Sequence, residues 1–311
     1  MKGVPSPWTL EDSLQELAHL ARTAGALVVA QVVQHLDSPS PFYIGRGKVE
    51  EVKALKQERG ANLALCDDEL APSQQKRLEE ALEVKVLDRS ALILDVFAQH
   101  ARTREGRLQV ELAQHQYLLP RLVHRWPHLE RPGSGIGTRG PGETQLETDR
   151  RLVRRRIQRL QEALERVRRH RALYRRRRRS SGAPVASLVG YTNAGKSTLF
   201  NALTRASVPV AEQLFSTLDP TTRRLHLPRG RDLLLTDTVG FIRKLPPTVV
   251  AAFRATLEEL EEADLLLHVV DISHPLAPLQ AQVVEETLSE LRLGRKPHLL
   301  VLNKADLLGE H

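Results

Sequence analysis

The stretch "VASLVGYTNAGKSTLFNAL", residues 185–203, decides the fold of the region that contains it. An apolar run leads into a turn that carries Gly190, Gly195, Lys196 and Ser197 at the spacing G-x-x-x-x-G-K-[ST], and an amphipathic helical pattern follows. Glycines let backbone N–H groups crowd around phosphate oxygens, and the helix directs its positive end at the same place. The stretch therefore predicts a strand, a phosphate-binding loop and a helix of a doubly wound P-loop domain.

The polar residues of this loop have distinct chemical roles. Lys196 supplies a point charge between the β- and γ-phosphates, so we count it as catalytic. The hydroxyl of Ser197 is short enough to bind Mg²⁺, which prefers oxygen ligands. We expect the rest of the loop to contact the nucleotide as well, namely Tyr191, Thr192, Asn193 and Ala194.

A second motif lies in "LLLTDTVGF", residues 233–241, where an apolar strand ends at Asp237. Asp237 can hold the Mg²⁺ through a water, and the Gly240 N–H can meet a γ-phosphate, which makes Gly240 a second catalytic position. Thr238 and Val239 lie between them and are expected to line the same nucleotide.

A third motif, "HLLVLNKAD" at residues 298–306, indicates which base is bound. Guanine presents N1–H and an exocyclic amine side by side, and the carboxylate of Asp306 can accept both hydrogen bonds. Adenine has an acceptor at N1 and would be rejected. The stem of Lys304 can cover the base and Asn303 can tie this loop to the phosphate turn, with Ala305 between them. The nucleotide predicted from the sequence is GTP, hydrolysed to GDP and phosphate.

Charge is distributed unevenly along the chain of 311 residues, whose net charge is +8. Residues 150–179 contain fifteen arginines and two acids, a net charge of +13, so the remainder carries about −5. A solvated helix face is one interpretation. Contact with a polyphosphate such as RNA is the interpretation we favour, because such a density of arginine suits nucleic acid.

The order of predicted elements gives an α/β protein with three domains. Residues 1–100 alternate between expected strands at 25–33, 61–68 and 84–88 and expected helices at 47–60 and 72–83, which is typical of a small parallel α/β domain. Residues 101–180 predict an antiparallel helical hairpin with apolar positions every three to four residues and a glycine-rich tip, and Pro120 should kink or end its first helix. Residues 181–311 form the P-loop domain.

Other features exclude several classes of protein. The lone Cys66 rules out an internal disulfide and reads as an inert core thiol, and no His/Cys cluster has the spacing of a zinc site. No apolar run is long enough for a membrane span, and no signal peptide is expected. We therefore expect a cytoplasmic monomer without an integral membrane segment.

Nearly the whole chain resembles the HflX family of ribosome-associated GTPases, within the translation-factor class. The resemblance rests on "FYIGRGKVEEV", "GSGIGTRGPGETQLETDRRL", "GYTNAGKSTLFNAL", "LFSTLDPTTRR", "DTVGFIRKLP" and "NKAD". It implies that "FSTLD" is the first switch, with Phe215, Ser216, Thr217, Leu218 and Asp219 at the nucleotide and Thr217 as the second hydroxyl ligand of Mg²⁺. The sequence alone leaves Thr221 and Thr222 as competitors for that role. Asn193 matches an asparagine that coordinates K⁺ in related GTPases; an ordinary asparagine before a helix is the equal alternative.

The resemblance also implies what the protein does. Family members bind the large ribosomal subunit and its RNA and split stalled ribosomes under stress. Phe241 stands where many GTPases have a water-orienting glutamine, so intrinsic hydrolysis should be slow and the missing group supplied by K⁺, another residue or the ribosome. Two alternatives are an RNA-binding adaptor with a mainly structural nucleotide, and a regulator of a membrane protease, which no sequence feature supports.

The family also has a last strand, a last helix and a small Ser-Ala loop that touches the guanine O6. The sequence ends at His311, five residues past Asp306. The expectation for this chain is a GTPase domain incomplete at its C-terminus and a weakened affinity for GTP.

Overall fold

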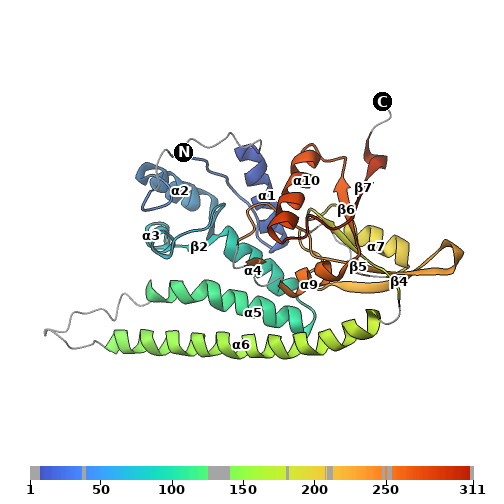
Figure 1. Ribbon diagram of the computed structural model, residues 1–311. Coiled ribbons are helices and arrows are strands. Elements are labelled where there is room, and N and C mark those ends of the chain that lie inside the picture. The colour runs from blue at the N-terminus through green and yellow to red at the C-terminus, as the bar shows by residue number, and fades with distance from the viewer. Residues whose placement is uncertain are drawn as a thin grey trace.

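The structure is a computed structural model that describes residues 8–36, 40–124, 141–179, 182–206, 208, 213–246, 249–250 and 254–308. It is an α/β protein in which a small N-terminal unit, a long two-helix arm and a nucleotide-binding unit follow one another along the chain (Figure 1). Within the described ranges, no helix combines the length and the apolar character needed to cross a bilayer.

The N-terminal unit surrounds a two-stranded parallel sheet of β1 and β2, in which Leu63 is opposite Lys85. Its apolar cluster joins this sheet to two helices that contact each other, through Val49, Leu78 and Val86. The elements are α1 (Leu10–Thr23), α2 (Arg46–Arg59), β1 (Leu63–Cys66), α3 (Pro72–Leu82), β2 (Lys85–Asp88) and α4 (Arg89–His100).

The expected strand at 25–33 is wrong. Residues 26–36 have no regular secondary structure and belong to no sheet; among the described residues, β1 and β2 pair only with each other. Ala26 and Val28 pack against the core, whereas Leu27 is 85% exposed. The alternation that suggested a strand reflects a segment that lies along the core without a sheet partner.

The arm consists of α5 (Arg104–Leu118), a 3-10 turn η1 (Leu119–His124) and α6 (Pro141–Arg179). In Figure 1 the two helices run side by side in opposite directions, and they make one of the larger contacts between helices in the structure. α5 ends directly before Leu119 and Pro120, as the proline predicts. Of the glycine-rich tip, residues 131–140 lie outside the described part of the chain.

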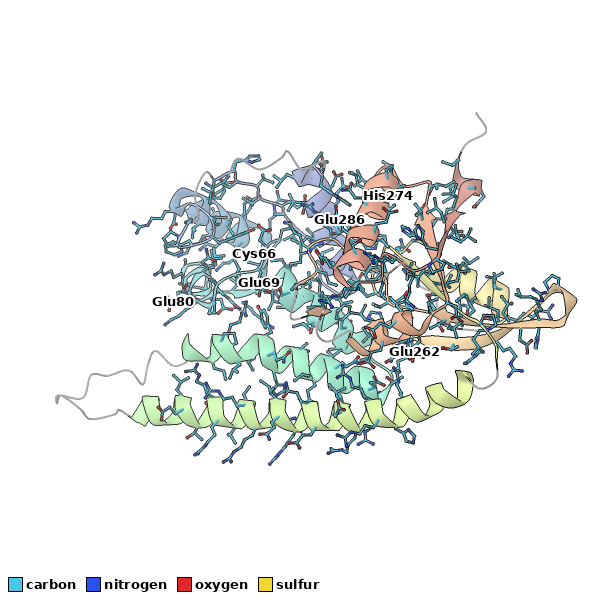
Figure 2. All side chains as sticks on the ribbon, in the orientation of Figure 1. Cys66, Glu69, Glu80, Glu262, His274 and Glu286 are labelled. Atoms are coloured by element: carbon cyan, nitrogen blue, oxygen red, sulfur yellow. The ribbon has the colours of Figure 1, made fainter. Side chains whose placement is uncertain are left out.

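The apolar seam predicted on α6 is confirmed by burial. Leu160 is 2% exposed, and Val153, Ile157, Leu164 and Val167 are half-buried between exposed neighbours. The other side of α6 faces away from α5, and Figure 2 shows a row of long side chains projecting from it. A helix buried on a narrow stripe and charged elsewhere is typical of an arm held from one side.

The nucleotide-binding unit has a five-stranded sheet in the order β4-β5-β3-β6-β7. β4 is antiparallel to β5 and all other neighbouring strands are parallel. The carboxyl ends of the parallel strands therefore meet at one edge, where ligands bind in open α/β sheets. The elements are β3 (Val185–Gly190), α7 (Lys196–Thr204), β4 (Thr221–Leu227), β5 (Arg231–Asp237), α9 (Arg254–Glu262), β6 (Leu265–Asp271), α10 (Ala277–Glu290), β7 (His298–Asn303) and η4 (Ala305–Leu307).

The last strand of this sheet, β7, pairs with β6 on one side. Leu299, Leu300 and Leu302 on β7 are each more than half exposed. This sheet edge therefore presents apolar side chains to solvent in the described part of the chain.

Candidate nucleotide-binding site

The loop between β3 and α7 requires glycine at both ends. A Cβ on Gly190 would lie 2.3 Å from the carbonyl oxygen of Val269, and a Cβ on Gly195 would lie 2.2 Å from the side-chain nitrogen of Asn303. Gly195 also has φ +93°, a conformation that disfavours any side chain. The motif glycines are thus fixed by close approach of neighbouring strands and loops.

The second motif lies directly against this loop. The Phe241 N–H donates to the Gly190 carbonyl at 3.0 Å, and the Thr192 N–H donates to the Phe241 carbonyl at 2.7 Å. A Cβ on Gly240 would meet the Thr192 Cα at 2.7 Å and the Lys196 Nζ at 3.0 Å. The Phe241 side chain is buried in the apolar core, so it reaches neither the loop's polar groups nor solvent.

Lys196 is buried beneath the loop, with 6% of its surface exposed. Its Nζ donates to the carbonyls of Gly190 at 3.2 Å and Tyr191 at 2.8 Å. Burial lowers the pKa of Lys196 to about 8, although the nearby Asp237 acts in the opposite direction. A bound phosphate would supply the negative charge that favours the protonated lysine.

Three oxygen-bearing side chains from different elements converge beside Lys196. The Ser197 hydroxyl donates to Asp237 Oδ2 at 2.7 Å and lies 2.8 Å from the Thr217 hydroxyl, which is 3.3 Å from the same carboxylate oxygen. The other carboxylate oxygen, Oδ1 of Asp237, is buried without a hydrogen-bond partner in the described structure. Burial raises the pKa of Asp237, against the lowering effect of the Ser197 hydrogen bond. This set of hard oxygen donors fits Mg²⁺.

The structure separates Thr217 from its two sequence competitors. Thr222 lies on β4, where its hydroxyl is 2.9 Å from the hydroxyl of Thr236 on the neighbouring strand. Thr221 is opposite Asp237 in the same antiparallel pair, as part of the backbone ladder. Thr217, by contrast, lies on the preceding loop and meets Ser197 directly.

The guanine motif lies next to the phosphate loop. Asn303 at the end of β7 donates to the Ala194 carbonyl at 2.8 Å, which is the tie that the sequence predicts. Lys304 adopts φ +60° and forms an ion pair with Asp271 at 2.6 Å. Ala305 and the exposed Asp306 follow in η4, at the same edge of the sheet.

The residues expected to form the first switch divide between two surroundings. Phe215, Ser216 and Thr217 line a pocket together with the phosphate loop and Gly240. Leu218 is buried in the core, and the Asp219 carboxylate accepts hydrogen bonds from the start of α5 instead. The residues that line this pocket are Thr192, Asn193, Gly195, Lys196, Ser197, Thr198, Phe215, Ser216, Thr217, Thr238 and Gly240.

The sequence motifs miss one residue of this site and do not reveal what holds another in place. Thr198 lines the pocket, and its hydroxyl directly after Ser197 is the signal that was available. Tyr191, predicted to contact the nucleotide, is not among the described residues that line the pocket. Its hydroxyl donates to Glu16 and accepts from the Arg243 N–H at 3.0 Å, and its ring stacks on Trp8 with centroids 6.4 Å apart. No local pattern predicts such contacts, because Glu16 and Tyr191 are far apart in the sequence.

The arginines of α6 fall into two groups, those that form ion pairs with neighbouring helices and those that are exposed to solvent. Arg156 and Arg171 fasten the helix to α5 through Glu111 at 2.5 Å and Glu105 at 2.8 Å. Arg168 reaches Glu258 on α9 at 3.1 Å. Arg151, Arg154, Arg155, Arg159 and Arg166 are exposed and have no ion pair with another described residue.

Comparison with known proteins identifies the family of the chain. Consecutive parts of the chain match three family models: "GTP-binding GTPase N-terminal" over residues 11–98, "GTP-binding GTPase Middle Region" over 100–178 and "50S ribosome-binding GTPase" over 185–304. The GTPase HflX of Caldanaerobacter subterraneus subsp. tengcongensis is 54% identical over 299 residues, covering 96% of this chain and 70% of that protein. The GTPase HflX of Escherichia coli K12 is 49% identical over 298 residues, again 96% of this chain and 70% of that protein.

The chain belongs to the HflX family of GTPases. As an HflX-family member it is a GTP-binding protein with a P-loop GTPase region, as its sequence motifs predict. Among solved structures, the SsGBP chain in a complex with GDP aligns with this HflX-family chain with a TM-score of 0.54 and 29% sequence identity. The alignment covers 95% of this chain and 80% of the SsGBP chain.

Proposed function

We propose that this chain hydrolyses GTP to GDP and phosphate with Mg²⁺, and that it binds the large ribosomal subunit and splits or rescues stalled ribosomes. It would act as a cytoplasmic monomer, with residues 1–100, 101–180 and 181–311 as its three domains. The observation that carries the proposal is the convergence of Ser197, Thr217 and Asp237 beside the buried Lys196, in a chain whose arm has an exposed arginine face.

Each catalytic group has a definite task in this proposal. Lys196 stabilises charge on the β- and γ-phosphates, and the Gly240 N–H, held against Thr192, orients the γ-phosphate. Ser197 and Thr217 would hold Mg²⁺ directly and Asp237 through a water. When bound, the ion neutralises charge that develops on the phosphate oxygens.

The group that positions the attacking water would come from outside these motifs. Phe241 is buried in the core, and a phenyl ring has no hydrogen-bonding group for water. A K⁺ ion held by Asn193, which lines the pocket with φ +62°, is one source. The ribosome is the other, and slow intrinsic turnover that rises on the ribosome follows from either.

Ribosome binding is supported by charge and by similarity. The exposed arginines of α6 would contact RNA phosphates independently of the RNA sequence. The model matching residues 185–304 is described as that of a 50S ribosome-binding GTPase. An RNA-binding adaptor with a structural nucleotide is the second candidate, favoured by the burial of Phe241.

Two measurements with purified large subunits test the proposal. Sedimentation with a non-hydrolysable GTP analogue should carry more of the chain into the subunit pellet than GDP does. GTP turnover should rise when subunits are added to saturation. Turnover that stays negligible with subunits bound selects the adaptor, and failure to sediment under both conditions rejects the ribosomal role.

A further inference from the structure

The carboxylate of Asp219 holds the start of α5, the first helix of the arm. It accepts hydrogen bonds from the backbone N–H groups of Arg102 at 2.9 Å and Thr103 at 2.8 Å, and a short one from the Thr103 hydroxyl. Thr103 is itself the N-cap of α5, because its side chain accepts from the Gly106 N–H at 3.0 Å. An acidic group at this position also favours the positive end of the helix.

Gly106 provides the space for this contact. A Cβ on Gly106 would lie 2.4 Å from Asp219 Oδ1, although this glycine is inside a regular helix where alanine is normally preferred. The helix itself has no need of glycine there. The missing side chain is explained by the position of the Asp219 carboxylate.

Asp219 connects the nucleotide pocket with the arm over a short path. Thr217, two residues earlier, is at the oxygen cluster with Ser197 and Asp237. Beyond Asp219, α5 is fastened to α6 through the ion pairs of Glu105 with Arg171 and Glu111 with Arg156. The described switch residues are thus continuous with the basic helix through packed and hydrogen-bonded groups.

We propose that Asp219 is a positioning residue that couples the occupancy of the nucleotide site to the orientation of the arm. The inference rests on the proposed function, because it needs GTP to engage Thr217. The contact between Asp219 and α5 holds the first switch in the position where Thr217 meets Asp237. Thr217 would hold the Mg²⁺ of bound GTP in that same position, and GDP lacks the γ-phosphate to which such a switch would respond. The attachment of α5 to the switch then strengthens GTP binding by a certain factor. By thermodynamic linkage, bound GTP strengthens that attachment by the same factor.

A purely structural contact makes a different prediction. If Asp219 only stabilised the fold, its loss would lower thermal stability and change the affinities for GTP and GDP alike. If Gly106 mattered only as a helix residue, Gly106→Ala would raise stability and leave nucleotide binding unchanged. Coupling instead lowers the affinity for GTP selectively.

The first test measures dissociation constants for a non-hydrolysable GTP analogue and for GDP. Asp219→Ala and Gly106→Ala should each reduce the preference for the analogue over GDP by about 5- to 100-fold, the usual range of coupling between sites. Asp219→Asn keeps one acceptor oxygen and should retain part of the preference. The matched control is Gly47→Ala, near the start of α2, where a Cβ meets nothing within 4 Å. Its preference for the analogue over GDP should equal that of the unaltered chain.

The second test measures the arm directly in the full chain. Cysteines are introduced at two exposed positions, Leu152→Cys on α6 and Leu203→Cys on α7, in a chain whose own cysteine is removed by Cys66→Ser. Both cysteines carry a spin label, and the distance between the two labels is measured with the analogue and with GDP. The separation should differ between nucleotides in the otherwise unaltered chain and in Gly47→Ala, and become the same for both nucleotides in Asp219→Ala and Gly106→Ala.

The outcomes distinguish this inference from the proposed function. An unaltered chain that binds the GTP analogue but shows one separation with both nucleotides overturns the coupling and leaves the GTPase proposal intact. So does Asp219→Ala with an unchanged preference for the analogue. An unaltered chain that binds no GTP rejects the proposed function itself. Should Asp219→Ala fail to fold, Gly106→Ala, whose alanine favours the helix, decides alone.

Discussion

The phosphate-binding loop and the arginine face of α6 are both suited to phosphate, but they differ in burial and precision. The loop encloses one buried lysine and backbone N–H groups between glycines that tolerate no side chain. The helix carries guanidinium groups that are exposed to solvent over several turns. Affinity at the loop should depend on geometry and barely on salt, whereas affinity at the arm should depend on charge and fall with salt.

The largest effect is expected for the base. Asp306→Asn replaces an acceptor with a donor and should lower GTP affinity by roughly a thousandfold or more, because guanine's paired donors then face an amide. The same variant should gain affinity for xanthosine triphosphate, which presents a carbonyl at that position. Titration with both nucleotides checks this, and unchanged selectivity for guanine would remove Asp306 from the base-binding role.

The next effect concerns the metal. Thr217→Ala should weaken Mg²⁺-dependent binding of GTP by about 10- to 100-fold and that of GDP much less, while Ser197→Ala should weaken both. Thr222→Ala is the matched control, because its hydroxyl bonds to Thr236 on the neighbouring strand. Binding is measured with and without Mg²⁺. A silent Thr217→Ala beside an impaired Thr222→Ala would place the switch ligand on β4.

The residues of the nucleotide site could be predicted from short sequence motifs, whereas the contacts between distant segments could not. The loop, Asp237 and Asn303 follow strand ends in short motifs, so residue type and spacing were enough to place them at one edge of the sheet. Contacts such as Asp219 with Thr103, or Tyr191 with Glu16, join segments separated by 116 and 175 residues. They depend on how the N-terminal unit and the arm pack against the nucleotide-binding unit, which no local pattern records. The strand expected at 25–33 was wrong for the same reason, since alternation cannot show whether a partner strand exists.

A smaller effect is expected from pH. The pKa of Lys196 is lowered to about 8 by burial, and a bound phosphate should raise it again. Nucleotide binding then takes up a proton above pH 8, so affinity should be constant below that value and fall about tenfold per pH unit above it. Calorimetric titrations between pH 7 and 9, in buffers of different ionisation enthalpy, measure both the affinity and the number of protons taken up on binding. Lys196→Arg, whose guanidinium stays charged, should abolish the dependence; a flat profile in the unaltered chain would contradict it.

The smallest effect concerns potassium. If Asn193 holds K⁺ at the γ-phosphate, GTP turnover should be severalfold faster in potassium than in sodium salts, and Asn193→Ala should remove the difference. Turnover is compared at equal ionic strength, so that screening is the same in both salts. Equal rates in the two salts would leave Asn193 as an ordinary residue of the turn before α7.

The most direct test of the account is the salt dependence of binding to purified large ribosomal subunits with a non-hydrolysable GTP analogue. Arg154, Arg155 and Arg159 are replaced by glutamine, while Arg156 is kept because it fastens α6 to Glu111. A control variant carries the same change at Arg223, Arg224 and Arg231, which are exposed on β4 and β5. The arm variant should bind more weakly, with a slope of log K against log salt shallower by about 2, while its GTP affinity is unchanged. Affinity and slope equal to those of the unaltered chain would contradict the account and leave the arginines as a solvated helix face.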